Sequence, residues 1–356
     1  MSETPGNALR ASIVGYGNIG PVHARAIASG GSARIEAICD IDPLRRESAA
    51  ASWPGTRIYA DFAEMLSRER PDSVHVCTPH HLHASMARAA LRSGAHVLME
   101  KPMALDLAEG QALAAEWRAS GRLLGLCFQN RYRPALIEAR RRLATGELGA
   151  ILGIKAVVAW KRDAAYYGQG GGWRGKWETE GGSAVINQAI HSLDLIQWLG
   201  GGCRDSRGIA GNLTLAGVIE TEDSAVIALD LACGGRGLLF ASNGWAEDSP
   251  VDLEILCERA RLRITDALYL STRESNSSGE TAPRAEPVRL APDESAAQDG
   301  RKAYWGAYHE ALIADFYDCA RRGAGFPLDP EEGLKTLRIL EGFYAGAGRA
   351  PRRAGR

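Results

Sequence analysis

The chain has 356 residues, of which 45% are hydrophobic and 24% charged, and its formal net charge at pH 7 is −1. This length is enough for two domains with buried cores, and the near-neutral charge disfavours a nucleic acid or a membrane surface as the main partner. No apolar run is long enough to span a membrane, and residues 1–10 lack the apolar core of a signal peptide. We therefore expect a globular, cytoplasmic protein with no membrane and no nucleic-acid partner.

The cysteine pattern argues against both a disulfide framework and a zinc site. The count of seven is odd, and no two cysteines have C-x-x-C spacing. Cys39, Cys77 and Cys127 lie within apolar runs. We expect reduced and mostly buried thiols.

The first element in chain order is a short apolar run near the N-terminus, which predicts a strand. A G-x-G-x-x-G pattern follows it, formed by Gly15, Gly17 and Gly20, with Asn18 and Ile19 inside the pattern. In a dinucleotide loop the first glycine permits a tight turn, the second lets the backbone approach a pyrophosphate, and the third lets the helix pack on the strand. The pattern predicts a dinucleotide site, and the alternative is an ordinary strand–turn–helix.

A second apolar run over residues 34–39 ends at Asp40, about twenty residues after the glycines. An acid at this place binds the ribose hydroxyls and repels a 2′-phosphate, so Asp40 favours NAD over NADP. Arg45 and Arg46 follow closely in the sequence and keep NADP as an alternative.

Short apolar runs alternate with helical segments through the first third of the chain, which predicts a parallel, doubly wound sheet. One of these runs ends before Thr78 and Pro79, and a later one ends before Glu100 and Lys101. Ligands of such sheets bind at the carboxyl ends of the strands. We therefore expect these residues to converge with the glycine loop and Asp40 on one crevice.

The second part of the chain has consecutive strand-like runs without helices between most of them. They cover residues 151–160, 209–215, 224–231, 236–242, 251–256 and 261–264. This order predicts a mostly antiparallel sheet, one face of which must be covered by helices or by another subunit.

Helical spacing in the second part predicts helices over residues 183–199, 304–322 and 330–344. Residues 275–298 are polar and predict a long surface loop or a flexible hairpin tip. We place a dinucleotide-binding domain at 8–128, a substrate-binding and oligomerisation domain at 129–348, and a basic tail at 349–356.

Lys101 is the first candidate for chemistry. It directly follows an apolar strand and precedes Pro102, which fixes the chain direction. A crevice can desolvate an ammonium group and fit it for proton transfer or for polarising a carbonyl. The alternative is a surface lysine at a strand end.

His191 is the second candidate, on the helix predicted over residues 183–199. Asn187 lies four residues earlier and shares its helix face, and Asp194 lies three residues later. A histidine in such surroundings can move a proton near neutral pH. The alternative is a core histidine hydrogen-bonded to Asp194.

No metal site is predicted. A second histidine at metal-ligand spacing from His191 is missing from the sequence. His80, His81 and His83 cluster at a strand-end turn, where capping and packing explain them better than a metal does.

The segment from Trp160 to Trp177 mixes aromatic residues with cations, among them Tyr167, Trp173 and Arg174. Aromatic rings stack on the apolar faces of sugars, and arginine grips a carboxylate or a phosphate. An oligomer interface favours the same residue types. The two alternatives stay open, and they can coexist.

These motifs together resemble the glucose–fructose oxidoreductase/inositol dehydrogenase (Gfo/Idh/MocA) family over nearly the full length. The resemblance rests on the glycine loop with His23, Cys39-Asp40, Thr78-Pro79 with His83, Glu100-Lys101-Pro102, and Gly181-Gly182 with His191 and Asp194. It implies an α/β Rossmann domain followed by an α+β domain with an open-faced sheet, assembled as a homodimer or homotetramer.

The resemblance also implies roles for single residues. Lys101 would lie beside the nicotinamide, His191 would act as acid and base, and Glu100, Thr78-Pro79 and His83 would belong to the cofactor site. The chain departs from many members at Asn187, where they have an aspartate. An asparagine cannot accept a proton, so Asn187 is expected to orient the substrate.

The resulting expectation is an NAD-dependent oxidoreductase that converts a hydroxyl of a sugar, a sugar derivative or a cyclitol to a ketone. The motif pattern of residues 166–191 resembles the branch of the family that acts on sugars, including nucleotide-linked ones. The alternatives are an NAD-binding sensor without catalysis and a redox-neutral, NAD-dependent glycosidase.

Overall fold

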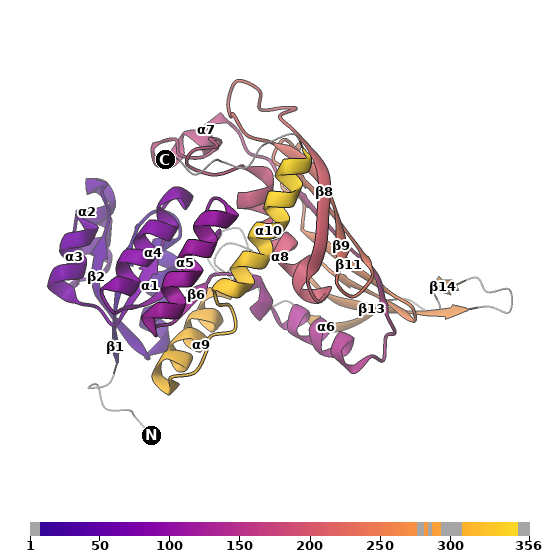
Figure 1. The fold of residues 1–356 in the computed structure, drawn as a ribbon, viewed down its shortest axis with the longest axis horizontal. Helices are drawn as coiled ribbons and strands as arrows, with labels where there is room; N and C mark the ends of the chain where they lie inside the picture. The colour runs from indigo at the N-terminus through magenta and orange to yellow at the C-terminus, as the bar shows by residue number, and fades with distance from the viewer. Residues whose placement is uncertain (1–7, 276–280, 284–286, 293–307, 348–356) are drawn as a thin grey trace. The chain divides into compact units, whose positions relative to one another are not determined.

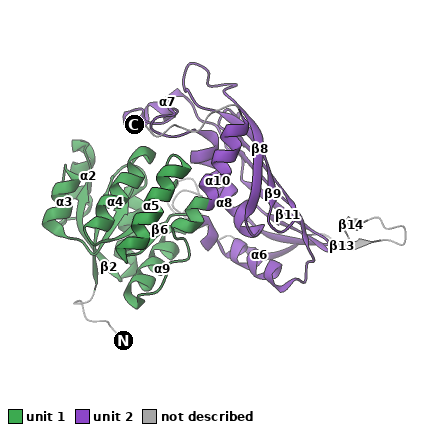
Figure 2. Cartoon of the chain, viewed as in Figure 1, with its two compact units in different colours: residues 1–129, 305–334 green, residues 130–304, 335–356 purple. Residues whose placement is uncertain are grey.

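The computed structural model describes residues 8–275, 281–283, 287–292 and 308–347. Contacts divide the chain into two compact units (Figure 2): unit 1 comprises residues 1–129 and 305–334, and unit 2 comprises residues 130–304 and 335–356. Each unit contains its own sheet. Two sheets with separate cores are the architecture expected of two domains.

Unit 1 is built on a six-stranded sheet with the order β3-β2-β1-β4-β5-β6, in which every neighbouring pair is parallel. Figure 1 shows helices α1 to α5 in indigo and purple around this sheet. The order reverses direction between β1 and β4, as in doubly wound dinucleotide-binding sheets. The prediction of a parallel, doubly wound sheet is confirmed. Its strands are β1 (Leu9–Val14), β2 (Ala33–Cys39), β3 (Arg57–Tyr59), β4 (Ser73–Val76), β5 (His96–Met99) and β6 (Leu124–Leu126).

Helices connect the strands of unit 1, and three of them begin at an aspartate. Asp42, Asp61 and Asp106 each accept a hydrogen bond from a backbone N–H of the first turn. These carboxylates satisfy donors that a helix N-terminus leaves without partners. The helices are α1 (Gly20–Gly30), α2 (Pro43–Ser52), α3 (Phe62–Glu69), η1 (His80–Leu82), α4 (His83–Arg92) and α5 (Leu107–Ser120). The short helix η2 (Gln129–Tyr132) follows β6 and continues into unit 2.

The chain returns to unit 1 near its C-terminal end. Helix α9 (His309–Arg322) packs against α1, and the hydroxyl of Tyr317 lies 2.9 Å from Ser73 Oγ and 2.7 Å from His75 Nε2. The sequence analysis placed this helix in the second domain. The boundary differs because apolar spacing predicts a helix but does not indicate which core its apolar side joins.

Unit 2 contains a nine-stranded sheet with the order β14-β13-β12-β11-β7-β10-β9-β8, with β15 beside β13. All its pairs are antiparallel except β7 with β10. The mostly antiparallel sheet is thereby confirmed. Its strands are β7 (Ile151–Ala159), β8 (Cys203–Gly211), β9 (Ser224–Leu231), β10 (Arg236–Ser242), β11 (Asp252–Cys257), β12 (Ala260–Ile264), β13 (Ala267–Ser275), β14 (Thr281–Pro283) and β15 (Val288–Pro292).

One face of this sheet is covered by helices of unit 2. Contacts join α8 to β7 and β10, and α6 to β12, β13 and β15. On the other face Ile209, Val226 and Leu238 are exposed, and Val226 pairs with Ile209 across β8 and β9. The helices of unit 2 are α6 (Pro134–Thr145), α7 (Ala164–Gly168), η3 (Gln169–Gly171), η4 (Ala184–Ala189), α8 (Ile190–Leu199) and α10 (Pro330–Gly346), whose residues from 335 on belong to it.

Two segments differ in part from the expected elements. Within residues 275–298, predicted as a surface loop or a hairpin tip, the described residues include β14 and β15, which both pair antiparallel with β13. Strand β8 begins at Cys203 instead of residue 209. The expected basic tail at 349–356 lies outside the described residues.

Among the described residues, none of the helices combines the length and the apolar character that crossing a membrane requires.

Candidate functional site

The loop between β1 and α1 has the geometry that its three glycines predict. Gly15 has a φ of +88°, and a Cβ there would lie 2.5 Å from the carbonyl oxygen of Cys77. A Cβ on Gly20 would lie 2.4 Å from the carbonyl oxygen of Gly15. Both positions therefore require glycine, one for the turn and one for the close packing of α1. A Cβ on Gly17 would meet only the guanidinium of Arg45, at 3.2 Å.

Asp40 follows β2 beside this loop and is buried. One carboxylate oxygen accepts from the N–H of Tyr16 at 2.6 Å, and the other accepts from the N–H of Asp42 at 2.8 Å. Arg45 Nη1 lies 3.7 Å from Asp40 Oδ2. The neighbouring Ile41 is 87% exposed. An acid fixed by backbone donors beside an exposed apolar side chain fits a ribose and the flat base attached to it.

Thr78 lies at the carboxyl end of β4. Its Oγ1 is buried and has no hydrogen-bond partner among the described residues. A buried hydroxyl without a partner costs free energy unless a ligand or a water satisfies it. Thr78 therefore offers a bond to a molecule at this edge of the sheet.

His83 was placed in the cofactor site by the family resemblance. In the structure its Nδ1 lies 2.7 Å from the carbonyl oxygen of Pro102, and its Nε2 lies 2.8 Å from that of Thr78. The ring thus joins the turns after β4 and β5. With both nitrogens against backbone carbonyls, His83 supports the site instead of presenting a ring nitrogen to a ligand.

Glu100 and Lys101 follow the end of β5. Lys101 is half-buried, and its peptide bond to Pro102 is cis. Glu100 Oε1 lies 3.1 Å from Nε2 of His23 and 3.1 Å from Nε2 of His309. Burial raises the pKa of Glu100, but the hydrogen bonds from the two imidazoles outweigh it and hold the pKa well below its usual range. Glu100 thus anchors the strand end that carries Lys101.

The regular helix predicted over residues 183–199 begins differently in the structure. Its first part, η4, is a π-helix, and the α-helix α8 starts only at Ile190. Glu222 Oε1 accepts from the N–H groups of Ser183 and Val185, at 3.0 and 3.1 Å, and holds this start in place. Asn187 lies in the π segment and His191 in the first turn of α8, so the simple spacing of one α-helix does not relate them. Such π segments are frequent at functional sites.

Asn187 is paired with a buried carboxyl group that the sequence analysis missed. Its Nδ2 donates to Glu180 Oε1 at 2.5 Å, and Glu180 Oε2 accepts from the N–H of Gly175 at 2.5 Å. Burial raises the pKa of Glu180 to about 7, although both hydrogen bonds favour the ionised form. Glu180 stands directly before Gly181 and Gly182, outside the helix predicted from residue 183, so the sequence analysis did not connect it to Asn187.

Asp194 has a structural partner. Arg131 donates to both of its oxygens, from Nε at 2.8 Å and from Nη2 at 2.5 Å, and both side chains are buried. Gln197 also donates to Asp194 Oδ1, at 3.2 Å. A bidentate pair of this kind neutralises a buried arginine. The sequence analysis had placed this carboxylate beside His191.

Tyr167, predicted to bind substrate, is buried on α7. Its hydroxyl lies 2.8 Å from Ser183 Oγ and accepts from Asn243 Nδ2 at 2.8 Å. Tyr167 packs with Leu215 and Ile219 in a small apolar cluster. It therefore supports the loop from within.

Arg174 and Trp173 lie half-buried on the same loop. The guanidinium carbon of Arg174 lies 4.7 Å from the ring centre of Trp173 and 4.9 Å from that of Tyr166. Arg174 Nε is buried without a hydrogen-bond partner among the described residues. An arginine held between two aromatic rings with a free donor is suited to a carboxylate or a phosphate.

The two parts of the chain match two models of one family. Residues 9–128 match the model of an oxidoreductase family with an NAD-binding Rossmann fold, and residues 136–263 match the GFO/IDH/MocA C-terminal domain. The first match covers the glycine loop, Asp40, Thr78 and Lys101. It confirms the prediction of a Rossmann domain for NAD.

Curated relatives include two sugar dehydrogenases. D-apiose dehydrogenase of Paraburkholderia graminis is 26% identical over 95% of this chain and 88% of its own length. D-glucoside 3-dehydrogenase of Escherichia coli is 28% identical, and that match spans 56% of this chain and about half of the relative, 55%.

Solved structures include the WlbA dehydrogenase of Bordetella pertussis in complex with NADH and UDP-GlcNAcA. It has a TM-score of 0.79 and 27% identity to this chain, and the match covers 96% of this chain and 97% of that one.

Proposed function

The chain belongs to the Gfo/Idh/MocA family of oxidoreductases, and from this premise we propose that it is an NAD-dependent dehydrogenase that oxidises a hydroxyl of a sugar, a sugar derivative or a cyclitol to a ketone. The observation that carries the proposal is the common position of four features at the carboxyl edge of one parallel sheet: the glycine loop, Asp40, the Thr78 hydroxyl and Lys101. We assign cofactor binding, predicted for residues 8–128, to unit 1, and substrate binding and oligomerisation, predicted for residues 129–348, to unit 2.

The residues at this edge fit a dinucleotide. Gly17 leaves room for a pyrophosphate, Asp40 would bind the adenosine ribose, and Thr78 would donate its free hydroxyl to the nicotinamide side. The bound nicotinamide supplies a hydride acceptor. Arg45 lies next to Asp40 and Gly17, so NADP remains an alternative to be measured.

Proton handling is assigned to Lys101 and His191. His191 removes the proton of the reacting hydroxyl, and Lys101 stabilises the developing negative charge on the same oxygen. Asn187 takes no proton and orients the substrate. Glu180 is a positioning residue, because its carboxyl oxygen accepts a hydrogen bond from the amide of Asn187 and so fixes that amide.

The substrate class follows from Arg174. Its unpartnered Nε and its position between Trp173 and Tyr166 favour a sugar with a carboxylate or phosphate group over a neutral one. The solved relative WlbA was crystallised with such a ligand, UDP-GlcNAcA. Nucleotide-linked sugars and sugar acids are therefore the first substrates to test.

The open face of the unit 2 sheet would be covered by a second copy of the chain, as a homodimer or homotetramer requires. Ile209 and Leu238 are 72% and 46% exposed on this face. Leu238→Glu should reduce the mass measured by light scattering. Leu213→Glu, at a leucine outside the strands that is 75% exposed, should leave the mass unchanged.

The deciding experiment measures reduced-nicotinamide absorbance after the full chain is mixed with NAD or NADP and with sugars, sugar acids, nucleotide sugars or inositols. Lys101→Met and His191→Gln should each lower kcat/KM by about 10²–10⁴-fold while NAD still binds. Lys335→Met, at an exposed lysine of α10, and His96→Gln, at the start of β5, serve as matched controls and should keep the activity.

Unchanged turnover in both site variants would refute the proposed proton handling. Tight NAD binding with no reduction by any compound would favour the sensor. Consumption of a glycoside without net reduction of NAD would favour the redox-neutral glycosidase.

A further inference from the structure

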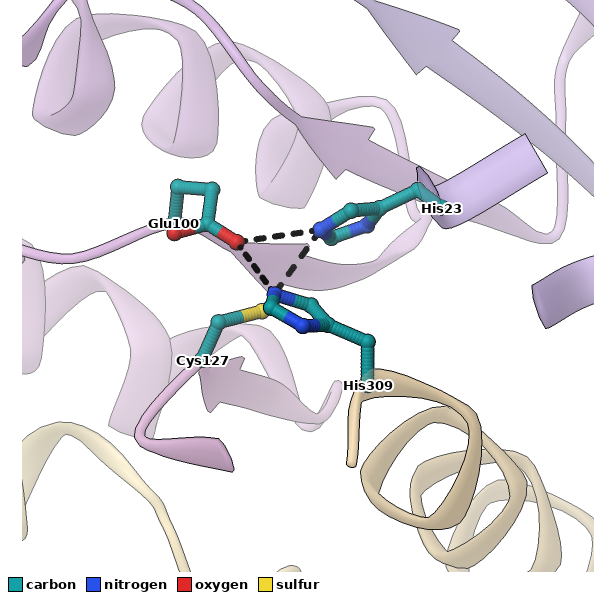
Figure 3. A group of neighbouring side chains, drawn as sticks. All are labelled: His23, Glu100, Cys127 and His309. Atoms are coloured by element: carbon teal, nitrogen blue, oxygen red, sulfur yellow. Dashed lines mark hydrogen bonds and ion pairs between the residues drawn. The ribbon is translucent and has the colours of Figure 1, made fainter. Parts of the chain in front are cut away.

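Four side chains that are distant in the sequence meet inside unit 1. His23 comes from α1, Glu100 follows β5, Cys127 follows β6, and His309 begins α9 (Figure 3). All four are buried, with exposed fractions of 0%, 8%, 0% and 1%. Each offers one potential ligand atom, and these four atoms lie within 4.8 Å of one another. We propose that this cluster is a structural zinc site.

The distances suit a tetrahedral ion. Glu100 Oε1 lies 3.1 Å from Nε2 of both His23 and His309, and Cys127 Sγ lies 3.9 Å from His23 Nε2. Four ligands around zinc at about 2.0–2.3 Å lie about 3.3–3.6 Å apart. The two 3.1 Å contacts are close to this size, and the longer separations, all within 4.8 Å, would shorten by up to about 1 Å when an ion binds. The side chains converge from four elements toward one point, as Figure 3 shows.

The types of donor atom in the cluster indicate which metal ion it would bind. Two imidazole nitrogens, one thiolate and one carboxylate oxygen suit zinc and disfavour magnesium and calcium, which take oxygen ligands. The charges also balance, because one dication neutralises the thiolate and the carboxylate while the imidazoles stay neutral. Four protein ligands leave no open position for water, so the site is structural and not catalytic.

A second layer of hydrogen bonds orients His23. Its Nδ1 lies 2.8 Å from Nδ1 of His75, and His75 Nε2 lies 2.7 Å from the hydroxyl of Tyr317, which in turn lies 2.9 Å from Ser73 Oγ. The hydrogens along this row can point either way. With a metal on Nε2, His23 donates from Nδ1 to His75, His75 donates to Tyr317, and Tyr317 donates to Ser73. Partners of this kind are typical of metal-bound histidines.

A zinc ion at this site would hold several elements of unit 1 together. It ties α9, which returns from the C-terminal part of the chain, to α1 and to the ends of β5 and β6. Glu100 immediately precedes Lys101, so the same ion would fix the strand end that carries the proposed catalytic lysine.

The alternative is a cluster without a metal, held by hydrogen bonds in which Glu100 Oε1 accepts from both imidazoles. The test uses the full chain, unfolded in chelator and refolded with zinc or cobalt, because the cluster is buried. We expect about one zinc per chain after gel filtration, and a cobalt derivative with tetrahedral absorption and a thiolate charge-transfer band. The melting temperature should rise with zinc.

Cys127→Ser and His309→Gln should lose the zinc, and Cys127→Ser should also lose the thiolate band. Cys257→Ser changes an equally buried cysteine in unit 2 and should keep both. If the variants do not fold, the cobalt spectrum of the unchanged chain decides. Absence of zinc after refolding, a cobalt spectrum without the thiolate band, or full zinc content in both ligand variants would overturn the proposal. None of these readouts depends on the proposed dehydrogenase activity.

Discussion

Glu100 in unit 1 and Glu180 in unit 2 are both buried carboxyl groups beside residues assigned to the reaction, but burial has opposite outcomes for them. Glu100 accepts from two imidazoles, and its pKa is held well below the usual range. Glu180 accepts from an amide and a backbone N–H, and burial raises its pKa to about 7.

The comparison teaches that the partner, and not burial alone, decides the charge of a buried acid. The hydrogen bonds from two imidazoles to Glu100 outweigh the loss of water around its carboxylate, whereas the amide and the backbone N–H at Glu180 do not. Glu100 is thus fitted to stay ionised, while Glu180 is fitted to change its charge near neutral pH.

The largest expected effect comes from Glu100→Gln in metal-free protein. Two hydrogen bonds to a charged acceptor become bonds to a neutral one, so we expect a loss of about 3–4 kcal/mol in the free energy of unfolding at pH 7. Since the pKa of Glu100 is lowered in the folded protein, its ionised form stabilises the fold above about pH 4.5. This contribution is lost as the pH falls through the folded pKa.

Urea unfolding measures the loss of stability in Glu100→Gln. The control is Glu138→Gln, at a surface glutamate paired with Arg141, which should cost less than about 1 kcal/mol. An equal cost for both variants would contradict the assigned difference.

Glu180 should show the opposite sign. The pKa of Glu180 is raised in the folded protein. Its contribution to the free energy of unfolding is therefore fully present below about pH 4.5 and is lost as the pH rises toward 7. A shift of this size corresponds to about 3 kcal/mol. Unfolding of the unchanged chain and of Glu180→Gln, compared at pH 5 and pH 8, should show the unchanged chain losing about this much relative to the variant. Parallel pH curves would show that Glu180 is ionised throughout.

Asn187→Asp sharpens the comparison by giving Glu180 a carboxyl partner. Two carboxyl groups at the 2.5 Å contact of the present pair must share a proton, so the pKa of the pair should rise by about one unit or more. If Glu180 affects the reaction, the apparent pKa near 7 in the pH dependence of kcat/KM should then shift to a higher pH. Asn212→Asp, whose amide donates to the carbonyl oxygen of Ile219, is the control and should leave that apparent pKa in place. An unmoved apparent pKa in Asn187→Asp would separate Glu180 from the reaction.

The sequence predicted the features that depend on local backbone geometry and missed those that depend on contacts between distant segments. Gly15 and Gly20 act through local backbone geometry, so their pattern predicted the loop, and the alternating runs predicted the sheet whose edge carries Asp40, Thr78 and Lys101. The periodicity of apolar residues identifies neighbours within one helix or strand. It could not predict the contact between His23 and His309 or the hydrogen bond between Glu180 and Asn187. Those contacts depend on which core α9 joins and on the π-helical start of the helix before His191.

The smallest expected effect concerns Thr78, a buried polar group with no protein partner among the described residues. Thr78→Val removes a hydroxyl that only a ligand or a water can satisfy, so the ligand-free protein should be as stable as before or slightly more stable. NAD binding should lose one hydrogen bond, about 1 kcal/mol or roughly fivefold in Kd by calorimetry. Thr265→Val, at a threonine whose hydroxyl donates to the adjacent Asp266 in unit 2, is the control for NAD binding. Unchanged NAD affinity in Thr78→Val would remove this hydroxyl from the cofactor site, and a loss of stability would show that the protein itself satisfies it.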